Sequence, residues 1–318
     1  MKNWVYIQSV LFALLGIGLV YLTFSKVSFS EILDVIKTGN FLVLIPVLLV
    51  SVSVVFIRVW RWGLLYKHGG LELKSSSLFF ALNIGYLVNF AVPRLGEVSR
   101  ALILKKSDEV PINQSISTIV FERLADMFAL FLVIIIAFVF ELIFGNGLLS
   151  HFTKDMDLHP GSKLIFLLLA LLAGIIIVFL FYKYRNKFGL WFSELMENFL
   201  HLFTLPEKFS FIISTILIWF GFYLMTYLWV FMFPASAGLG MYPCYQVMVL
   251  GVIARTLPIQ AGSAGAYHYV VSTAFILLGT DQNTAGALAI VIHGFQSLLT
   301  LLLGLISYLC FLYFGSRK

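Results

Sequence analysis

Seven charged side chains fall inside segments of the chain that are otherwise strongly apolar. They are four arginines and three carboxylates: Arg94, Glu97, Arg100, Glu122, Arg123, Asp126 and Arg255. An ionised group at the centre of a membrane helix costs about 2.5–3.5 kcal/mol on insertion scales, so such groups pair with one another or line a polar cavity. We therefore expect all seven to point into the protein, where they could bind an ionic ligand.

The spacing of these residues allows two interpretations. Glu97 is three residues from both Arg94 and Arg100, and Asp126 is three residues from Arg123, so each group could form ion pairs within one helix. In the first interpretation the pairs are structural and join the helix that carries Glu97 to the helix that carries Asp126. In the second they bind a ligand, because four arginines against three carboxylates leave one positive charge that a phosphate group would satisfy.

A second group of candidate binding residues follows Pro258. Gly262 and Gly265 would let the backbone approach a lipid headgroup closely, although glycines in membrane helices equally serve helix packing. His268 lies just beyond and is a candidate for phosphate or sugar contact or for proton exchange. His293 is a separate case, which we interpret as a hydrogen-bonding group between helices.

Several kinds of chemistry have no matching motif. The histidines and cysteines lack the spacing of a metal site, and the chain has no phosphate-binding loop of the ATPase type. We therefore expect no metal, no cofactor and no ATP hydrolysis.

The elements that must position these residues are membrane helices. The 318 residues are 61% hydrophobic and 11% charged, with a mean hydropathy of +0.99, which is too apolar for a water-soluble domain of this length. We predict an all-α polytopic membrane protein in a single domain, residues 1–318. Apolar runs near the ~20 residues of a spanning helix predict six full spans, over residues 5–24, 41–62, 116–144, 164–182, 209–233 and 284–314.

Two further apolar regions, residues 75–106 and 244–279, are each broken in the middle by proline, glycine and polar residues. Each predicts a pair of helices too short to cross the bilayer, which makes them candidate re-entrant hairpins and brings the total to eight or more membrane helices. Residues 29–37 and 188–203 are amphipathic and predict helices that lie on the membrane surface.

The net charge of +6 reflects orientation rather than a nucleic-acid partner. With the N-terminus inside, thirteen Lys and Arg side chains fall on the cytoplasmic side and four outside, which predicts that both termini are cytoplasmic. In this topology Arg58, Trp60 and Arg61 form an aromatic and basic belt at the inner interface.

Three motifs in this order resemble the transmembrane domain of bacterial lysylphosphatidylglycerol synthase/flippase and its stand-alone flippase-like relatives. The motifs run over residues 89–100, with Gly96-Glu97-x-x-Arg100; over 122–126, with Glu122-Arg123-x-x-Asp126; and over 258–268. The chain departs from the family pattern at Ala261, where a proline is usual, and at His268, where a carboxylate is common. The synthase domain has no counterpart here, so the resemblance implies lipid translocation without lipid synthesis.

We therefore predict a non-enzymatic lipid flippase of the cell's inner (cytoplasmic) membrane, with homo-oligomerisation possible. It would move an anionic phospholipid or a lipid-linked headgroup, polyprenyl-phosphate or glycolipid, through an arginine-rich cavity. One alternative is a membrane-embedded transferase that uses Glu122 and Asp126 with His268 as acid and base. Another is a membrane scaffold without transport activity.

Overall fold

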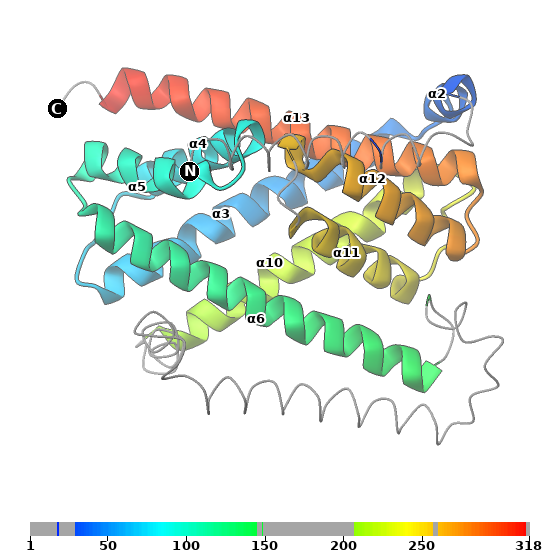
Figure 1. Cartoon of the computed structure of the whole chain (residues 1–318), viewed down its shortest axis with the longest axis horizontal. Coiled ribbons are helices and arrows are strands. Elements are labelled where there is room, and N and C mark those ends of the chain that lie inside the picture. The colour runs from blue at the N-terminus through cyan, green and yellow to red at the C-terminus, as the bar shows by residue number, and fades with distance from the viewer. Residues whose placement is uncertain (1–17, 19–28, 145–147, 149–206, 257–259, 316–318) are drawn as a thin grey trace.

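The computed structural model describes residues 18, 29–144, 148, 207–256 and 260–315, and these residues are almost entirely helical (Figure 1). No strand occurs among them, so the all-α prediction is confirmed for this part of the chain. The predicted spans over residues 5–24 and 164–182 and the predicted surface helix over 188–203 lie outside the described residues.

Four long helices form the frame of the molecule. They are α3 (Leu44–His68), α6 (Ile112–Phe144), α10 (Lys208–Trp229) and α13 (Gln282–Gly315). Short 3-10 turns extend two of them, η1 (Phe41–Val43) before α3 and η4 (Val230–Met232) after α10. All four are long and apolar enough to cross a bilayer, so four of the six predicted spans are confirmed as helices of spanning length.

Two pairs of shorter helices pack against this frame. The first pair is α4 (Ser75–Ala91) with α5 (Leu95–Asp108), and the second is α11 (Met241–Thr256) with α12 (Gln260–Leu277). The pairs lie toward opposite ends of α13, which packs against both α4 and α12 (Figure 1). The predicted breaks in these two regions are confirmed. Their entry into the membrane as re-entrant hairpins, and the position of the termini, stay predictions.

The chain reverses between α4 and α5 at the predicted proline. Val92 is extended, and Arg94 just after Pro93 has φ +71°, a left-handed conformation that non-glycine residues rarely adopt. Beyond this turn the two helices touch through their backbones, because a Cβ added to Gly96 would overlap the carbonyl oxygen of Gly85. Glycine at position 96 therefore determines how closely α5 lies against α4.

The second helix of the second pair begins earlier than the sequence predicts. We expected a turn over residues 258–265, but α12 already begins at Gln260, so Gly262 and Gly265 lie in its first two turns. A glycine inside a helix costs only about 1 kcal/mol relative to alanine, so glycine alone does not end a helix. A φ of +61° at Ser263 marks a local distortion between the two glycines.

The helix α2 (Phe29–Lys37) forms over the residues predicted for a surface helix. Its Ile32 is fully buried, and its Glu31 accepts a hydrogen bond of 3.0 Å from Asn283. The helix packs against α13. Its place at the membrane surface stays a prediction.

The apolar core has two main parts. One, around Trp229 and Phe275, joins α10, α11, α12 and α13, and the other, around Trp62 and Leu104, joins α3, α4, α5 and α6. Large apolar side chains such as Phe131 and Leu302 remain exposed on α6 and α13. Such exposure is ordinary for helices whose outer faces contact lipid.

Candidate functional site

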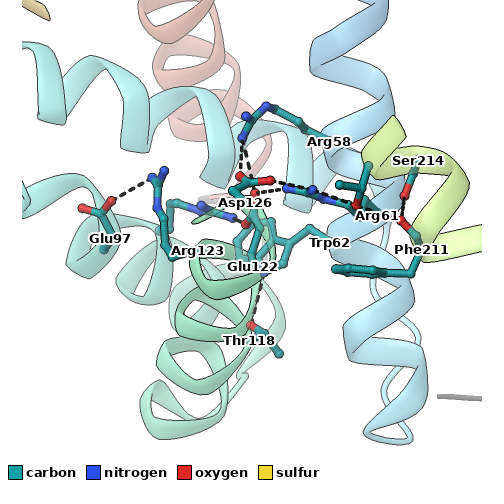
Figure 2. Close-up of polar contacts among 12 residues, drawn as sticks. Arg58, Arg61, Trp62, Glu97, Thr118, Glu122, Arg123, Asp126, Phe211 and Ser214 are labelled. Atoms are coloured by element: carbon teal, nitrogen blue, oxygen red, sulfur yellow. Dashed lines mark hydrogen bonds and ion pairs between the residues drawn. The ribbon is translucent and has the colours of Figure 1, made fainter. Parts of the chain in front are cut away.

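An ionic network joins α3, α5 and α6 (Figure 2). Arg61 donates to Asp126 at 2.7 Å and to Oε1 of Glu122 at 3.3 Å. Arg100 donates to the other oxygen of Glu122, Oε2, at 2.7 Å. Arg58 adds ion-pair contacts of 3.5 Å to both carboxylates. We call these three arginines and two carboxylates the central network.

Helical periodicity brings the members of the central network together. Arg58 and Arg61 are three residues apart on α3, and Glu122 and Asp126 are four apart on α6, so each pair lies on one face of its helix. Arg100 reaches the same point from α5, where it packs directly on Gly85 of α4.

Burial and aromatic contacts shield most of the central network. Arg61, Arg100 and Glu122 are 0%, 1% and 2% exposed. The guanidinium of Arg100 lies 3.9 Å above the ring of Trp62, in a cation–π contact. At this depth an ion pair stabilises the protein only while both partners remain, because a single buried charge is very costly.

A second ion pair lies beside the central network and is more exposed. Arg123 of α6 donates to Glu97 of α5 at 2.8 Å, with side chains 43% and 30% exposed. Asn89 of α4 supports the pair, because its amide nitrogen donates to Glu97 and its amide oxygen accepts the Gly96 N–H at 2.7 Å. This pair therefore also links the first helix pair to α6.

The ion pairs run between helices, not within them. The sequence predicts pairs of Glu97 with Arg94 or Arg100, and of Asp126 with Arg123. In the structure Glu97 pairs with α6 and Asp126 pairs with α3. Side chains three or four residues apart point toward the same neighbouring helix, where the opposite charges are found. Ion pairs therefore do join α5 to α6, as the first interpretation expects, and ligand binding by the same residues stays a prediction.

Arg58 and Arg61 do not form the interfacial belt that the sequence predicts. Both belong to the central network, and α3 continues to His68, about 15 Å beyond Arg58 at the rise of an α-helix. The signal that could have identified them is their spacing. Two arginines three residues apart complement two carboxylates four residues apart on another helix.

Two of the arginines expected to point inward are exposed. Arg94 caps the start of α5, and Arg255 lies near the end of α11. The guanidinium of Arg255 lies 4.3 Å above the ring of Tyr267 and donates to Gln296. For these two positions the expectation of burial is wrong, because each stands at a helix end where the polar head reaches the surface.

His268 and His293, which the sequence leaves as separate cases, lie side by side. Their ring centroids are 4.9 Å apart, and Tyr267 packs 5.5 Å from His293. These residues join α12 to α13, and Arg255 connects them to α11 through Tyr267. Gly262 and Gly265 belong to α12 as His268 does, so the predicted site residues divide between the helices of the central network and α11, α12 and α13.

A further buried carboxylate, Glu141 of α6, is not among the predicted site residues. Its side chain is 4% exposed and accepts hydrogen bonds from the Tyr242 hydroxyl at 2.9 Å and the Gln246 amide at 2.6 Å. Both donors belong to α11. This contact holds the second helix pair against α6, the helix that also carries Glu122.

The donor set of the central network suits an anion better than a metal ion. Both carboxylates are engaged by arginines, and among the described residues no group of three or more His, Cys, Asp or Glu side chains could hold a metal. Guanidinium groups bind phosphate oxygens in a planar, two-point geometry.

A family model described as "Lysylphosphatidylglycerol synthase TM region" matches residues 7–304. The match includes both helix pairs and every residue of the central network. No curated protein and no solved structure matches the chain significantly.

Proposed function

Because the chain belongs to the family of the lysylphosphatidylglycerol synthase transmembrane region, we propose that it is a lipid transporter. It moves an anionic phospholipid or a lipid-linked headgroup across the bilayer, while the lipid tails stay in the hydrocarbon. The chain is a multi-pass membrane protein by family and by its four helices of spanning length. We place it in the cytoplasmic membrane.

The observation that supports this proposal most is the central network itself. Five ionised side chains lie together between two helices of spanning length and the first helix pair, where each costs about 2.5–3.5 kcal/mol on insertion scales. Such a concentration of charge, with three arginines, supplies groups that bind an anionic headgroup away from water.

The alternative of a membrane-embedded transferase requires Glu122 or Asp126 to exchange protons with a substrate. Both oxygens of Glu122 accept from arginines, Oε1 from Arg61 and Oε2 from Arg100, and Asp126 accepts from Arg61, so each carboxylate is committed to an ion pair. His268, the other residue of that hypothesis, packs against α13 beside His293. These contacts favour transport over group transfer.

The test is reconstitution into vesicles with fluorescently labelled phospholipids, followed by addition of a membrane-impermeant quencher. We expect wild-type protein to expose inner-leaflet lipid to the quencher, and Arg100→Gln to slow this at least tenfold. Lys37→Gln, on the exposed face of α2, serves as the control and should transport at the wild-type rate.

Three outcomes would contradict the proposal. If wild-type vesicles behave as protein-free vesicles, the protein does not transport these lipids. If mass spectrometry finds covalently altered lipid after incubation, the transferase is the better hypothesis. Folded Arg100→Gln protein of lower stability and unchanged lipid distribution would favour the scaffold.

A further inference from the structure

The central network carries one more positive than negative charge. Arg61 with Asp126 and Arg100 with Glu122 form two close pairs, each at 2.7 Å. The third arginine, Arg58, is held more loosely. Its nearest carboxylate oxygens are 3.5 Å away and its hydrogen bond to the Tyr86 hydroxyl measures 3.3 Å. The excess charge therefore resides on Arg58.

Arg58 also lies where the central network meets its surroundings. Its side chain and that of Asp126 are 13% and 16% exposed, whereas Arg61 and Arg100 are closed off. An anion that approaches the network thus meets Arg58 first. The guanidinium of Arg58 is also the one that has no carboxylate oxygen at close hydrogen-bonding distance.

The same network also contains hydrogen-bond donors without a partner. Nε of Arg61 and both Nε and Nη1 of Arg100 are buried without a hydrogen-bond partner. Buried donors of this kind are costly, so the network has hydrogen-bonding capacity that its own carboxylates do not use. The charge excess and the unused donors are independent observations, and both point to an anionic ligand.

We propose that Arg58 binds the anionic oxygen of the ligand and that the central network accepts a single negative charge. The fitting chemical class is a phosphodiester, as in the headgroup of phosphatidylglycerol, rather than a phosphomonoester or a pyrophosphate. One negative charge neutralises the network, while a second would remain uncompensated in a medium of low dielectric constant. That the ligand is a lipid rests on the proposed function, whereas the charge count applies equally to a free phosphodiester.

The test measures lipid binding by the full chain in nanodiscs of zwitterionic phosphatidylcholine above about pH 8, where a phosphomonoester carries two charges. We expect phosphatidylglycerol to bind at least tenfold more tightly than phosphatidylcholine, and phosphatidic acid to bind no more tightly than phosphatidylglycerol. Arg58→Gln should abolish this preference and Arg58→Lys should keep most of it. Lys67→Gln, an exposed cation of the same helix, should leave it unchanged.

A charge-neutralising substitution tests the count directly. Asp126→Asn raises the net charge of the central network by one unit, so the variant should shift its preference toward phosphatidic acid. In solution, dimethyl phosphate should displace bound phosphatidylglycerol more readily than inorganic phosphate does. Failure of both soluble anions, with lipid selectivity intact, would identify the lipid as the source of the phosphodiester.

Three results would overturn the inference: tighter binding of phosphatidic acid than of phosphatidylglycerol by the wild type, stronger displacement by inorganic phosphate, or unchanged selectivity in folded Arg58→Gln. If that variant does not fold, the comparison of the three lipids on wild-type protein decides. Selective binding without translocation would refute the transport proposal alone. Translocation with unchanged selectivity in Arg58→Gln would refute the role of Arg58 alone.

Discussion

Glu122 accepts hydrogen bonds from arginines on two different helices. This sharing explains how the protein tolerates buried charged side chains. Oε1 faces Arg61 of α3, and Oε2 faces Arg100 of α5. A carboxylate in this position satisfies two cations at once. Each cation in turn rests on an aromatic ring, Phe211 under Arg61 and Trp62 under Arg100.

Burial decides how much each ion pair contributes to stability. We expect Arg100→Ala to lower the free energy of unfolding by about 3–5 kcal/mol, since it leaves Glu122 buried without its closest partner. Arg123→Ala breaks a pair of nearly the same length at an exposed position and should cost about 1 kcal/mol or less. Denaturation in detergent micelles measures both values, and equal losses would contradict this account.

At this scale the sequence predicts which residues are ionic but not their partners. Arg94 and Arg100 both lie three residues from Glu97, yet one is exposed and the other is fully buried. The difference depends on which face of α5 meets α4 and α6, and that is a property of tertiary packing. Local spacing shows that Arg58 and Arg61 share a face of α3 but not which helix that face meets, so the sequence alone assigned both to the membrane interface.

The packing of α4 on α5 depends on a contact between two backbones. We expect Gly96→Ala to destabilise the protein by about 1–3 kcal/mol, because the new Cβ would overlap the Gly85 carbonyl and push α5 away. Gly294→Ala in α13 is the matched control, since its Cβ would meet nothing within 4 Å.

The control should be neutral or slightly stabilising, because alanine is the better helix former. The displaced α5 also carries Arg100, so Gly96→Ala should reduce lipid transport together with stability. Thermal unfolding and the vesicle assay measure the two effects. Equal behaviour of the two alanine variants would show that the backbone contact is unimportant.

Asp281 caps the start of α13, where its Oδ1 accepts the N–H of Thr284 at 2.9 Å. Partial burial raises the pKa of Asp281, while hydrogen bonds from the Thr284 backbone and side chain lower it. The hydrogen bonds outweigh burial, so the pKa lies below its ordinary value. Because the pKa is lower in the folded state, the ionised cap stabilises the protein above the unfolded value near 3.8, and this contribution fades as the pH falls through the folded value.

We therefore expect Asp281→Ala to cost about 1 kcal/mol at pH 7, with a smaller difference from wild type below about pH 4. Asp281→Asn keeps a capping side chain without the charge and should show no such fading. Unfolding curves at several pH values make the comparison. A constant difference between Asp281→Ala and wild type across this range would contradict the assignment.

The helix boundaries that proline determines were predictable, and those that depend on tertiary contacts were not. The break at Pro93 follows from its missing N–H and restricted backbone. The early start of α12 did not follow, because Gly262 and Gly265 resemble turn residues yet stay helical. The extension of α3 to His68 was equally hidden, since Arg58 and Arg61 lowered the apparent hydropathy of a helix that buries them.

Orientation in the membrane is a property of the whole chain. We expect single cysteines at Lys74 and Lys106 to react with an impermeant maleimide only after permeabilisation of cells, and one at Lys37 to react from outside. The background would replace the two free cysteines, Cys244 and Cys310, by alanine. Because residues 74 and 106 flank the first helix pair, labelling from opposite sides would exclude a re-entrant hairpin there.

The helix α13 contacts both helix pairs along its length, at α12 near its start and at α4 where Gly304 packs on Leu87. It is therefore a packing surface that both helix pairs share. If one helix pair tilts, the surface of α13 on which the other pair packs must shift with it. Tightly packed interfaces shift between discrete arrangements rather than deform continuously. A ligand that tilts one helix pair would therefore have to shift that pair's contact with α13, the helix that the other pair also contacts.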